Sequence, residues 1–181
     1  MILIGLGANL PTIYGGPQDT LRAALSVMPA FGIDVTRVSS FYCTPAMAHD
    51  VQPPYVNAVA VVRSLLPAIE LLEMLHRIEE QFGRVRKSRW APRTLDIDLL
   101  DYEGQIVTDD GPRGADAGVG TLPLALPHPG IAERGFVLVP LVELVPEWRH
   151  PVTGQDSLAL LSVLKAAQGD AALAGIERIS A

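Results

Sequence analysis

The stretch YVNAVAVVRSLLPAIELLEMLHRIEEQFG, residues 55–83, predicts a strand followed by a helix, and this pair decides the fold. Residues 55–64 carry apolar side chains on both alternating faces, so we expect a strand that is covered on both sides. In the second part, Pro67 marks the helix start and Gly83 marks its end. Between them runs an apolar stripe at helical spacing, which consists of Leu71, Leu72, Leu75, Ile78 and Phe82.

The flanking segments complete this unit. Residues 1–7, 33–42 and 95–102 predict three more strands, and residues 17–28 and 156–167 predict two more helices. Residues 43–54 contain several prolines and predict a loop, whereas residues 135–148 are apolar but include Pro140, which leaves helix and strand both open. The order β-α-β-β-α-β is that of a ferredoxin-like unit. We therefore expect an α+β fold with a βαββαβ core, a mainly antiparallel sheet and helices on both sides.

The composition favours a single folded domain over residues 1–181. Hydrophobic residues make up 49% of the chain, which is enough for a substantial core. Cys43 is the only cysteine, which excludes an internal disulfide and fits the reducing cytoplasm. No apolar run reaches the roughly 18 residues of a membrane helix, and the first residues do not resemble a signal peptide. We expect a cytoplasmic protein that does not associate with membranes.

The charges change sign abruptly in the middle of the chain. Residues 84–93 hold five basic residues and no acid, whereas residues 96–110 hold six acids and no base. A basic loop beside an acidic strand predicts a site for metal ions and a polyphosphate, and a solvated charged loop is the alternative. The net charge of −6 argues against a protein that coats nucleic acid.

Asp96 and Asp98 are the candidate metal ligands. On a strand, side chains two residues apart point to the same face, about 6.5 to 7 Å from each other. Two carboxylates at this spacing can bridge two divalent ions, and ligation by carboxylates alone favours Mg²⁺ or Mn²⁺. The alternative is that one aspartate faces solvent at a strand end and the other caps a turn.

The basic loop supplies candidate phosphate ligands. Arg84, Arg86 and Arg93 can each bind phosphate oxygens through two parallel hydrogen bonds and keep their charge. Trp90, in the same loop, either covers a flat ligand or anchors the loop to the core.

Several isolated residues fit the same chemistry. Tyr55 and Asn57 share one strand face, where an aromatic plane and an amide suit a flat, nitrogen-rich heterocycle. His128 lies between two prolines, six residues before Arg134, and either the pair donates to phosphates or both residues face solvent. Glu79 lies at the edge of the apolar stripe, where it either holds a loop arginine or faces water.

The turn GLGANL, residues 5–10, resembles the start of a dinucleotide-binding G-x-G-x-x-G motif. Leu10 stands where the third glycine is required, and Asp34 begins its strand instead of ending it. We therefore reject a dinucleotide site and keep the alternative of a tight turn that brings backbone close to a ligand.

Six motifs in order resemble one known family. They are GLGANL (5–10), SSFYCTPA (39–46), PPYVNAV (53–59), IEEQFGRVRKSRWAPRTLDIDLLDY (78–102), LPHPGIAERGFVLVPL (126–141) and ELVPEWRHP (143–151). Over about residues 1–165 the chain resembles the 6-hydroxymethyl-7,8-dihydropterin pyrophosphokinases of folate biosynthesis. The resemblance implies transfer of pyrophosphate from MgATP to the pterin hydroxymethyl group, which leaves AMP, by a monomer that binds small molecules and no nucleic acid.

The resemblance also implies roles for individual residues. The catalytic residues would be Arg84, Arg93, Asp96 and Asp98, with the two aspartates bridging two Mg²⁺ ions. The ATP-binding residues would be Glu79, Arg84, Arg86, Arg93, Ile97, His128 and Arg134. The pterin-binding residues would be Gly7, Thr44, Pro45, Tyr55, Asn57, Trp90 and Phe136, with Tyr55 and Phe136 sandwiching the ring.

The chain departs from the family pattern at three places. Ala8 stands where the family has serine, residues 11–19 differ from the usual short acidic continuation, and residues 109–123 form a longer connection that we expect to be an inserted flexible loop. Two other functions remain open at this point. One is another Mg²⁺-dependent nucleotidyl- or phosphotransferase, and the other is a ferredoxin-like nucleic-acid-binding module, against which the net charge argues.

Overall fold

An antiparallel sheet forms the middle layer of the structure, a computed structural model that describes residues 1–46, 52–84, 91–108 and 124–180. Its strands are β1 (Ile2–Ala8), β2 (Asp34–Val38), β3 (Tyr42–Thr44), β4 (Tyr55–Arg63), β5 (Asp96–Tyr102) and β6 (Glu177–Arg178). The strand order is β5-β1-β4-β3-β6, and β2 pairs with β4 beyond the end of β3. Because β2 and β3 pair with β4 in succession, they act as one interrupted strand of a ferredoxin-like sheet.

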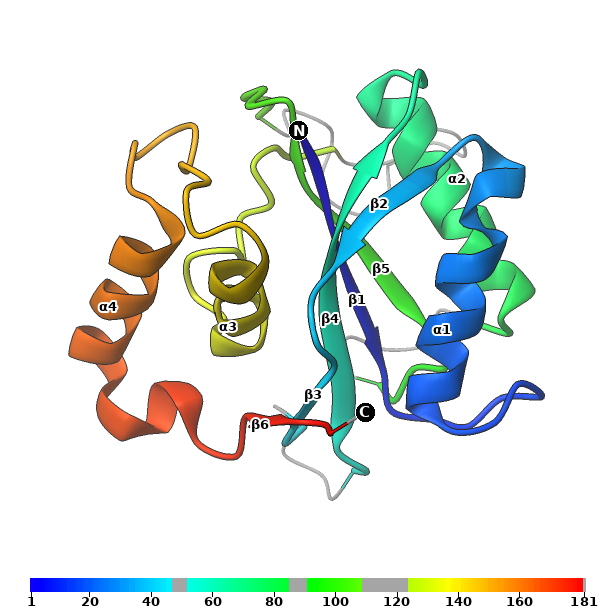
Figure 1. The fold of residues 1–181 in the computed structure, drawn as a ribbon, viewed down its shortest axis with the longest axis horizontal. Coiled ribbons are helices and arrows are strands. Elements are labelled where there is room, and N and C mark those ends of the chain that lie inside the picture. Colours follow the sequence, from blue (N-terminus) through cyan, green and yellow to red (C-terminus); the bar gives the residue numbers. More distant parts are fainter. Residues whose placement is uncertain (47–51, 85–90, 109–123, 181) are drawn as a thin grey trace, which may run out of the picture.

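Helices cover both faces of this sheet (Figure 1). They are α1 (Pro17–Val27), α2 (Ala68–Gln81), α3 (Gly135–Leu144) and α4 (Ser157–Gln168), with the 3₁₀ helices η1 (Met28–Phe31) and η2 (Gly169–Leu173). The helices α1 and α2 lie on one side, and α3 and α4 lie on the other. The predicted α+β fold with helices on both sides is confirmed. Within the described ranges, no helix has the length and hydrophobicity to cross a membrane.

The two faces of β4 belong to two separate cores, as its sequence predicts. Val56, Ala60 and Val62 pack into the cluster between the sheet and α1 and α2. Val59 and Val61 pack into the cluster between the sheet and α3 and α4. The predicted apolar stripe of α2 is buried in the first cluster. A strand covered on both sides therefore holds the three layers together.

The prediction of one strand over residues 33–42 and a loop over residues 43–54 is wrong in part. The strand breaks at Ser39, whose hydroxyl accepts the Val59 N–H at 3.0 Å and so takes the place of a backbone partner. Pairing resumes beyond the break, where Cys43 lies opposite Val56 and Thr44 lies opposite Tyr55. The interruption follows from a hydrogen bond between distant segments, which local alternation of residue types does not encode.

The apolar segment that contains Pro140 is a helix, which resolves the open alternative. Helix α3 begins after Arg134, ends at Leu144 and contains Pro140 in its interior. It packs against β4 on one side and α4 on the other. The helix is apolar on several sides because it is buried between the sheet and α4.

A bulge in β5 turns extra side chains toward α3 and α4. The pairing of β1 with β5 shifts between Leu3, opposite Asp101, and Ile4, opposite Leu99. Leu100 is the additional residue, and it packs in the core on the α3 and α4 side. Asp101 faces the same side, where it accepts the Trp148 indole N–H at 3.2 Å.

Candidate active site

One cavity of about 460 Å³ opens between the sheet, the loop before α3 and the start of α3. Its size is within the range of small-molecule sites. Among the residues predicted for the pterin, Gly7, Thr44, Pro45, Tyr55, Asn57 and Phe136 line it. Among those predicted for ATP and metal, Glu79, Arg84, Arg93, Asp96, Asp98, His128 and Arg134 line it. Segments that are far apart in the sequence therefore meet in a single cavity.

Of the predicted site residues, Arg86 and Trp90 lie outside the described residues, as does the proposed insertion 109–123. Ile97 is described, but its side chain does not line the cavity. Ile97 alternates with the two aspartates on β5, so its side chain is buried in the opposite core. Its backbone N–H donates to Glu79 Oε1 at 2.6 Å, which gives Ile97 a backbone contact with the site wall.

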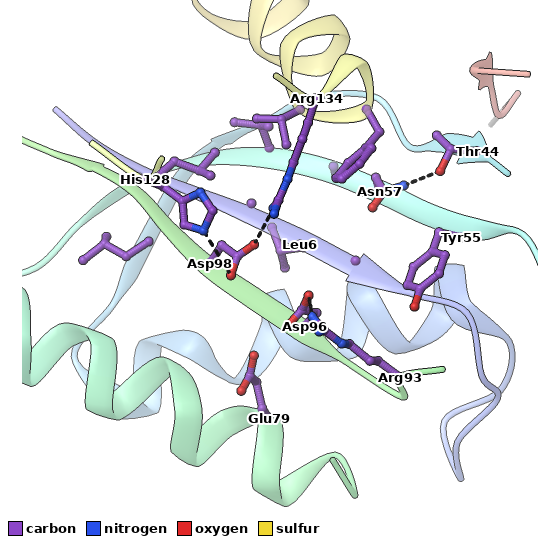
Figure 2. A pocket seen from close by; sticks show the side chains of 18 of the residues that line it. Leu6, Thr44, Tyr55, Asn57, Glu79, Arg93, Asp96, Asp98, His128 and Arg134 are labelled. Carbon is purple, nitrogen blue, oxygen red and sulfur yellow. Dashed lines mark hydrogen bonds and ion pairs between the residues drawn. The ribbon is translucent and has the colours of Figure 1, made fainter. Parts of the chain in front are cut away.

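Asn57 is the central polar group at one end of the cavity. Its amide Nδ2 donates to Thr44 Oγ1 at 2.8 Å, and both residues are buried (Figure 2). Gly7 lies opposite Asn57 in the β1–β4 ladder, and a Cβ on Gly7 would lie 2.9 Å from Asn57 Oδ1. Only glycine therefore lets the amide lie flat against β1 with its oxygen near the cavity.

Two aromatic rings stand at the same end. Tyr55 begins β4, and burial raises the pKa of its phenol, so the ring is neutral at physiological pH. Phe136 stands in the first turn of α3, and the Arg134 guanidinium carbon lies 5.9 Å from its ring centre. The Tyr55 ring comes from the sheet and the Phe136 ring from a helix, and the amide of Asn57 belongs to the same part of the cavity lining.

The two aspartates lie at the β5 end of the cavity, across β1 from Asn57, and have different partners (Figure 2). Asp96 forms ion pairs with Arg84 and Arg93. Asp98 lies 4.0 Å from His128 Nε2 and 3.9 Å from an Arg134 terminal nitrogen. Both side chains point into the cavity, so the predicted placement of two carboxylates on one face is observed. This end combines negative charge on the sheet with positive charge around it.

Burial and neighbouring charges shift the pKa values of Asp98 and His128. Burial raises the pKa of Asp98 and the neighbouring Asp96 adds to the increase, while His128 and Arg134 oppose it. Burial also lowers the pKa of His128, and Asp98 opposes that decrease. The Gly130 N–H donates to His128 Nδ1 at 3.0 Å, so the neutral ring carries its proton on Nε2, the nitrogen that faces Asp98.

Backbone hydrogen bonds fix His128 and Arg134 beside the carboxylates. The His128 N–H donates to the Leu100 carbonyl of β5 at 2.8 Å. Arg134 is the N-cap of α3, and its carbonyl accepts the N–H groups of Val137 and Leu138 at 3.0 Å. A hydrogen bond to β5 therefore fixes the His128 backbone, and the start of α3 fixes that of Arg134.

Glu79 connects α2 to the acidic strand. Its side chain is 1% exposed, accepts the Ile97 N–H and forms an ion pair with Arg84. The Arg84 N–H also donates to the Glu79 carbonyl at 3.1 Å, beyond the last turn of α2. Of the two alternatives left open for Glu79, the structure shows the contact with an arginine, Arg84, and the same arginine also reaches Asp96.

Asn9 is a residue next to the site that its sequence position did not reveal. It is 2% exposed, its Oδ1 accepts the Arg93 N–H at 2.8 Å, and its Nδ2 donates to the Pro53 carbonyl at 3.2 Å. Its own N–H donates to the Arg93 carbonyl at 3.0 Å. Asn9 therefore joins the end of β1 to the Arg93 segment and to the residues before Tyr55. The feature of the sequence that indicates this role is a polar amide directly after a buried strand, in the turn that also holds Gly5 and Gly7.

The fold and the charged cavity are those of an α+β phosphotransferase. Residues 3–146 match the family model for 7,8-dihydro-6-hydroxymethylpterin-pyrophosphokinase. The chain therefore belongs to the 7,8-dihydro-6-hydroxymethylpterin pyrophosphokinase family. The predicted activity, ATP-dependent transfer of pyrophosphate in folate biosynthesis, is confirmed at the level of this family, and the two alternative functions are not favoured.

Relatives in other organisms carry the same family name. A 2-amino-4-hydroxy-6-hydroxymethyldihydropteridine pyrophosphokinase of Synechocystis sp. is 37% identical over 160 residues, which are 88% of this chain and 73% of that protein. A protein of the same name from Haemophilus influenzae is 37% identical over 145 residues, which are 80% of this chain and 81% of that protein.

A solved structure supports the fold independently. The wild-type HPPK-DHPS of Plasmodium falciparum with pteroate superposes with a TM-score of 0.72 at 13% identity, over 99% of this chain and 46% of that one. This chain spans less than half of that protein, and at this identity the likeness shows the fold alone.

Proposed function

We propose that the cavity binds MgATP at its charged end and 6-hydroxymethyl-7,8-dihydropterin at the Tyr55 and Asn57 end. The pterin hydroxyl oxygen attacks the β-phosphorus, the bond from that phosphorus to the bridging α-phosphate oxygen breaks, AMP leaves with that oxygen, and the hydroxyl proton is released to solvent. The observation that carries this proposal is the opening of both ends into one cavity. A shared cavity places the two substrates side by side, as an in-line displacement requires.

At the pterin end, we assign face and edge recognition to different residues. Tyr55 and Phe136 bind the two faces of the ring by stacking. The Asn57 amide, held by Thr44, reads the polar edge with the help of backbone groups near Gly7 and Pro45. The hydrogen bond from Asn57 to Thr44 supports this assignment, because it fixes which amide atoms remain for the ligand.

At the ATP end, we assign Asp96 and Asp98 as ligands of two magnesium ions. Oxygen-only donors on a strand fit magnesium, which retains water and takes its other ligands from phosphates. No cluster of three or more metal-binding side chains occurs in the described ranges, which agrees with a site completed by the nucleotide. When bound, the metal would neutralise charge on the triphosphate.

The cationic side chains bind the phosphates and stabilise the developing charge. We propose that Arg84 and Arg93 leave Asp96 for phosphate oxygens when the nucleotide binds. Arg134 and the Nε2 proton of His128 contact the remaining phosphates, and Glu79 keeps Arg84 close to the site. Arg86 and Trp90 belong to the same basic segment of the sequence, and we propose that Arg86 binds ATP and Trp90 binds the pterin. Preorganised donors of this kind contribute a large share of catalysis in phosphoryl transfer.

We further propose that residues 1–181 act as one monomeric, cytoplasmic domain that binds no nucleic acid. The lining of the cavity by strands, loops and helices of a single chain supports a monomer. The lone Cys43 supports a reducing compartment, and the net charge of −6 disfavours a nucleic-acid partner.

The test is release of AMP from ATP, with and without Mg²⁺ and the dihydropterin. We expect release only with all three present, and a loss of at least about a hundredfold in Asp96→Asn or Asp98→Asn. Asp34→Asn, at an exposed strand position remote from the cavity, is the matched control and should retain full activity. Pterin-independent ATP turnover, or full activity of both cavity variants, would contradict the proposal.

A further inference from the structure

The last segment of the described chain, residues 169–180, returns from α4 to the sheet and is here named the C-terminal strap. It contains η2 and β6 and runs beneath α3 to the edge of the sheet at β3 (Figure 1). It begins more than twenty residues beyond position 146, where the match to the family model ends. The strap touches two walls of the cavity, and each wall carries residues that we assign to the pterin.

The first contact is with the start of α3. A Cβ on Gly135 would lie 2.2 Å from the Ala172 carbonyl oxygen and 3.1 Å from Ile176 Cδ1. The strap therefore packs directly on the backbone of Gly135. This glycine stands between Arg134 and Phe136, so the position of the Phe136 ring depends on what lies behind it.

The second contact is with the edge strand β3. Tyr42 pairs with Arg178 and Cys43 pairs with Glu177, and the Ile179 N–H donates to the Phe41 carbonyl at 2.8 Å. The strand β3 has only three residues; one of its edges pairs with β4, and β6 pairs with the other. The pairing therefore restrains the strand that ends in Thr44.

The strap also touches the residue that follows this strand. Gly175 has a φ of +70°, and a Cβ on it would lie 3.0 Å from Pro45 Cδ. Pro45 lines the cavity. The strap therefore packs closely against the Pro45 wall as well as against the residue that precedes Phe136.

Polar contacts tie the strap to both walls together. Arg178 donates from Nε to Ser40 Oγ at 2.7 Å and lies 3.6 Å from a Glu143 carboxylate oxygen. Glu143 belongs to α3 and accepts the Tyr42 hydroxyl at 2.9 Å. The strap, α3 and β3 therefore form one connected unit.

We infer that the C-terminal strap is a positioning element for the pterin: it holds the Pro45 and Phe136 walls at the separation that the ring requires. The inference rests on the proposed assignment of these walls to the pterin. The acidic pair lies on β5, at the opposite edge of the sheet from β6. We therefore expect the strap to affect binding of the pterin much more than binding of ATP.

The first experiment removes the strap by ending the chain at Gln168. Pterin affinity is measured by equilibrium titration in the presence of Mg²⁺ and a non-hydrolysable ATP analogue, and nucleotide affinity is measured alone. We expect the dissociation constant of the pterin to rise by about tenfold. We expect the constant of the nucleotide to rise clearly less than that of the pterin, because Arg134 lies beside the strap contact at Gly135 whereas the carboxylates lie on β5, at the opposite edge of the sheet from β6.

A pair of glycine substitutions tests the inference without removing any residue. Gly175 and Gly154 have the same φ of +70°, so alanine strains the backbone similarly at both positions. A Cβ on Gly154 meets nothing within 4 Å, whereas one on Gly175 meets Pro45. We expect Gly175→Ala to weaken pterin binding at least threefold more than Gly154→Ala, at a similar loss in melting temperature.

The outcomes separate this inference from the proposed function. If the unmodified chain releases no AMP in a pterin-dependent way, the proposed function fails. If the unmodified chain is active and the folded, shortened chain binds the pterin equally well, the inference about the strap alone is overturned. If the shortened chain does not fold, the glycine pair decides, and equal pterin affinities of Gly175→Ala and Gly154→Ala overturn the inference.

Discussion

Gly7→Ala is the substitution that tests most directly how the pterin end of the cavity is built. The added Cβ would lie 2.9 Å from Asn57 Oδ1, where an ordinary carbon–oxygen contact needs about 0.4 Å more. The amide must rotate away from Thr44, or β1 must move away from β4. Rotation breaks a buried hydrogen bond of 2.8 Å, and leaving such groups unpaired costs about 1 to 3 kcal/mol.

Gly5→Ala is the matched control on the same strand. Gly5 lies two residues from Gly7, on the same face, and also lines the cavity. A Cβ on Gly5 would lie 3.4 Å from the end of the Leu100 side chain, which is ordinary van der Waals contact. Both substitutions remove the same backbone freedom, so their difference isolates the contact with Asn57.

The assay is the Michaelis constant for the dihydropterin, measured by release of AMP at saturating MgATP. From the cost above, we expect Gly7→Ala to raise this constant by about 5- to 150-fold and Gly5→Ala by less than about twofold. The constant for ATP should be similar in both variants, because a Cβ on Gly7 meets only Asn57 and Tyr55 within 4 Å and one on Gly5 meets Leu100 first, although both glycines pair with β5. Equal pterin constants in the two variants would refute the proposal that the orientation of Asn57 determines recognition.

Two further predictions concern residues that hold the walls together. Asn9→Ala leaves the Arg93 N–H and the Pro53 carbonyl without their side-chain partner, so the free energy of unfolding by urea should fall by about 1 to 3 kcal/mol and kcat should fall with it. Asn9→Asp, which keeps only the acceptor, should restore part of the loss. Partial burial alone would raise the pKa of Glu143, but hydrogen bonds from Ser40 and Tyr42 outweigh burial and bring the pKa below its ordinary 4.5. The ionised carboxylate therefore contributes stability above that pH, and the contribution disappears as the pH falls through the lowered pKa. The difference in unfolding free energy between wild type and Glu143→Gln, about 1 kcal/mol at pH 7, should shrink towards pH 3, and a constant difference would contradict this account.

The local spacing of apolar residues was sufficient to predict the strand and the helix at the centre of the fold. The two apolar faces of β4 predicted a strand with a core on each side, and the stripe of α2 predicted the face that it buries. The spacing of Asp96 and Asp98 predicted two carboxylates on one face, because alternation along a strand depends only on the backbone. These features depend on neighbours in the sequence, which is why the sequence alone could predict them.

The features that the sequence did not predict all depend on contacts between distant segments. The break at Ser39 depends on a hydrogen bond with Val59, and the turn of Asp101 toward Trp148 depends on a bulge against β1. Asn9 was missed for the same reason, since its role is defined by Arg93 and Pro53, more than forty residues away. Side chains that join separate segments have no local periodicity, although they determine the shape of the cavity.

The ion pairs of Asp96 suggest how nucleotide and metal binding are coupled. Two carboxylates of β5 and that of Glu79 face three guanidiniums, those of Arg84, Arg93 and Arg134, so these charges balance before any ligand binds. A polyphosphate offers the arginines more negative charge than a single carboxylate does, and pairs of its oxygens can accept two parallel hydrogen bonds from a planar guanidinium. If the arginines move to the phosphates, as proposed above, Asp96 loses its partners and would be available to hold the metal that arrives with the nucleotide. In the absence of nucleotide, the same arginines compete with the cation for Asp96. We therefore expect ATP to strengthen Mg²⁺ binding, and linkage requires Mg²⁺ to strengthen ATP binding by the same factor.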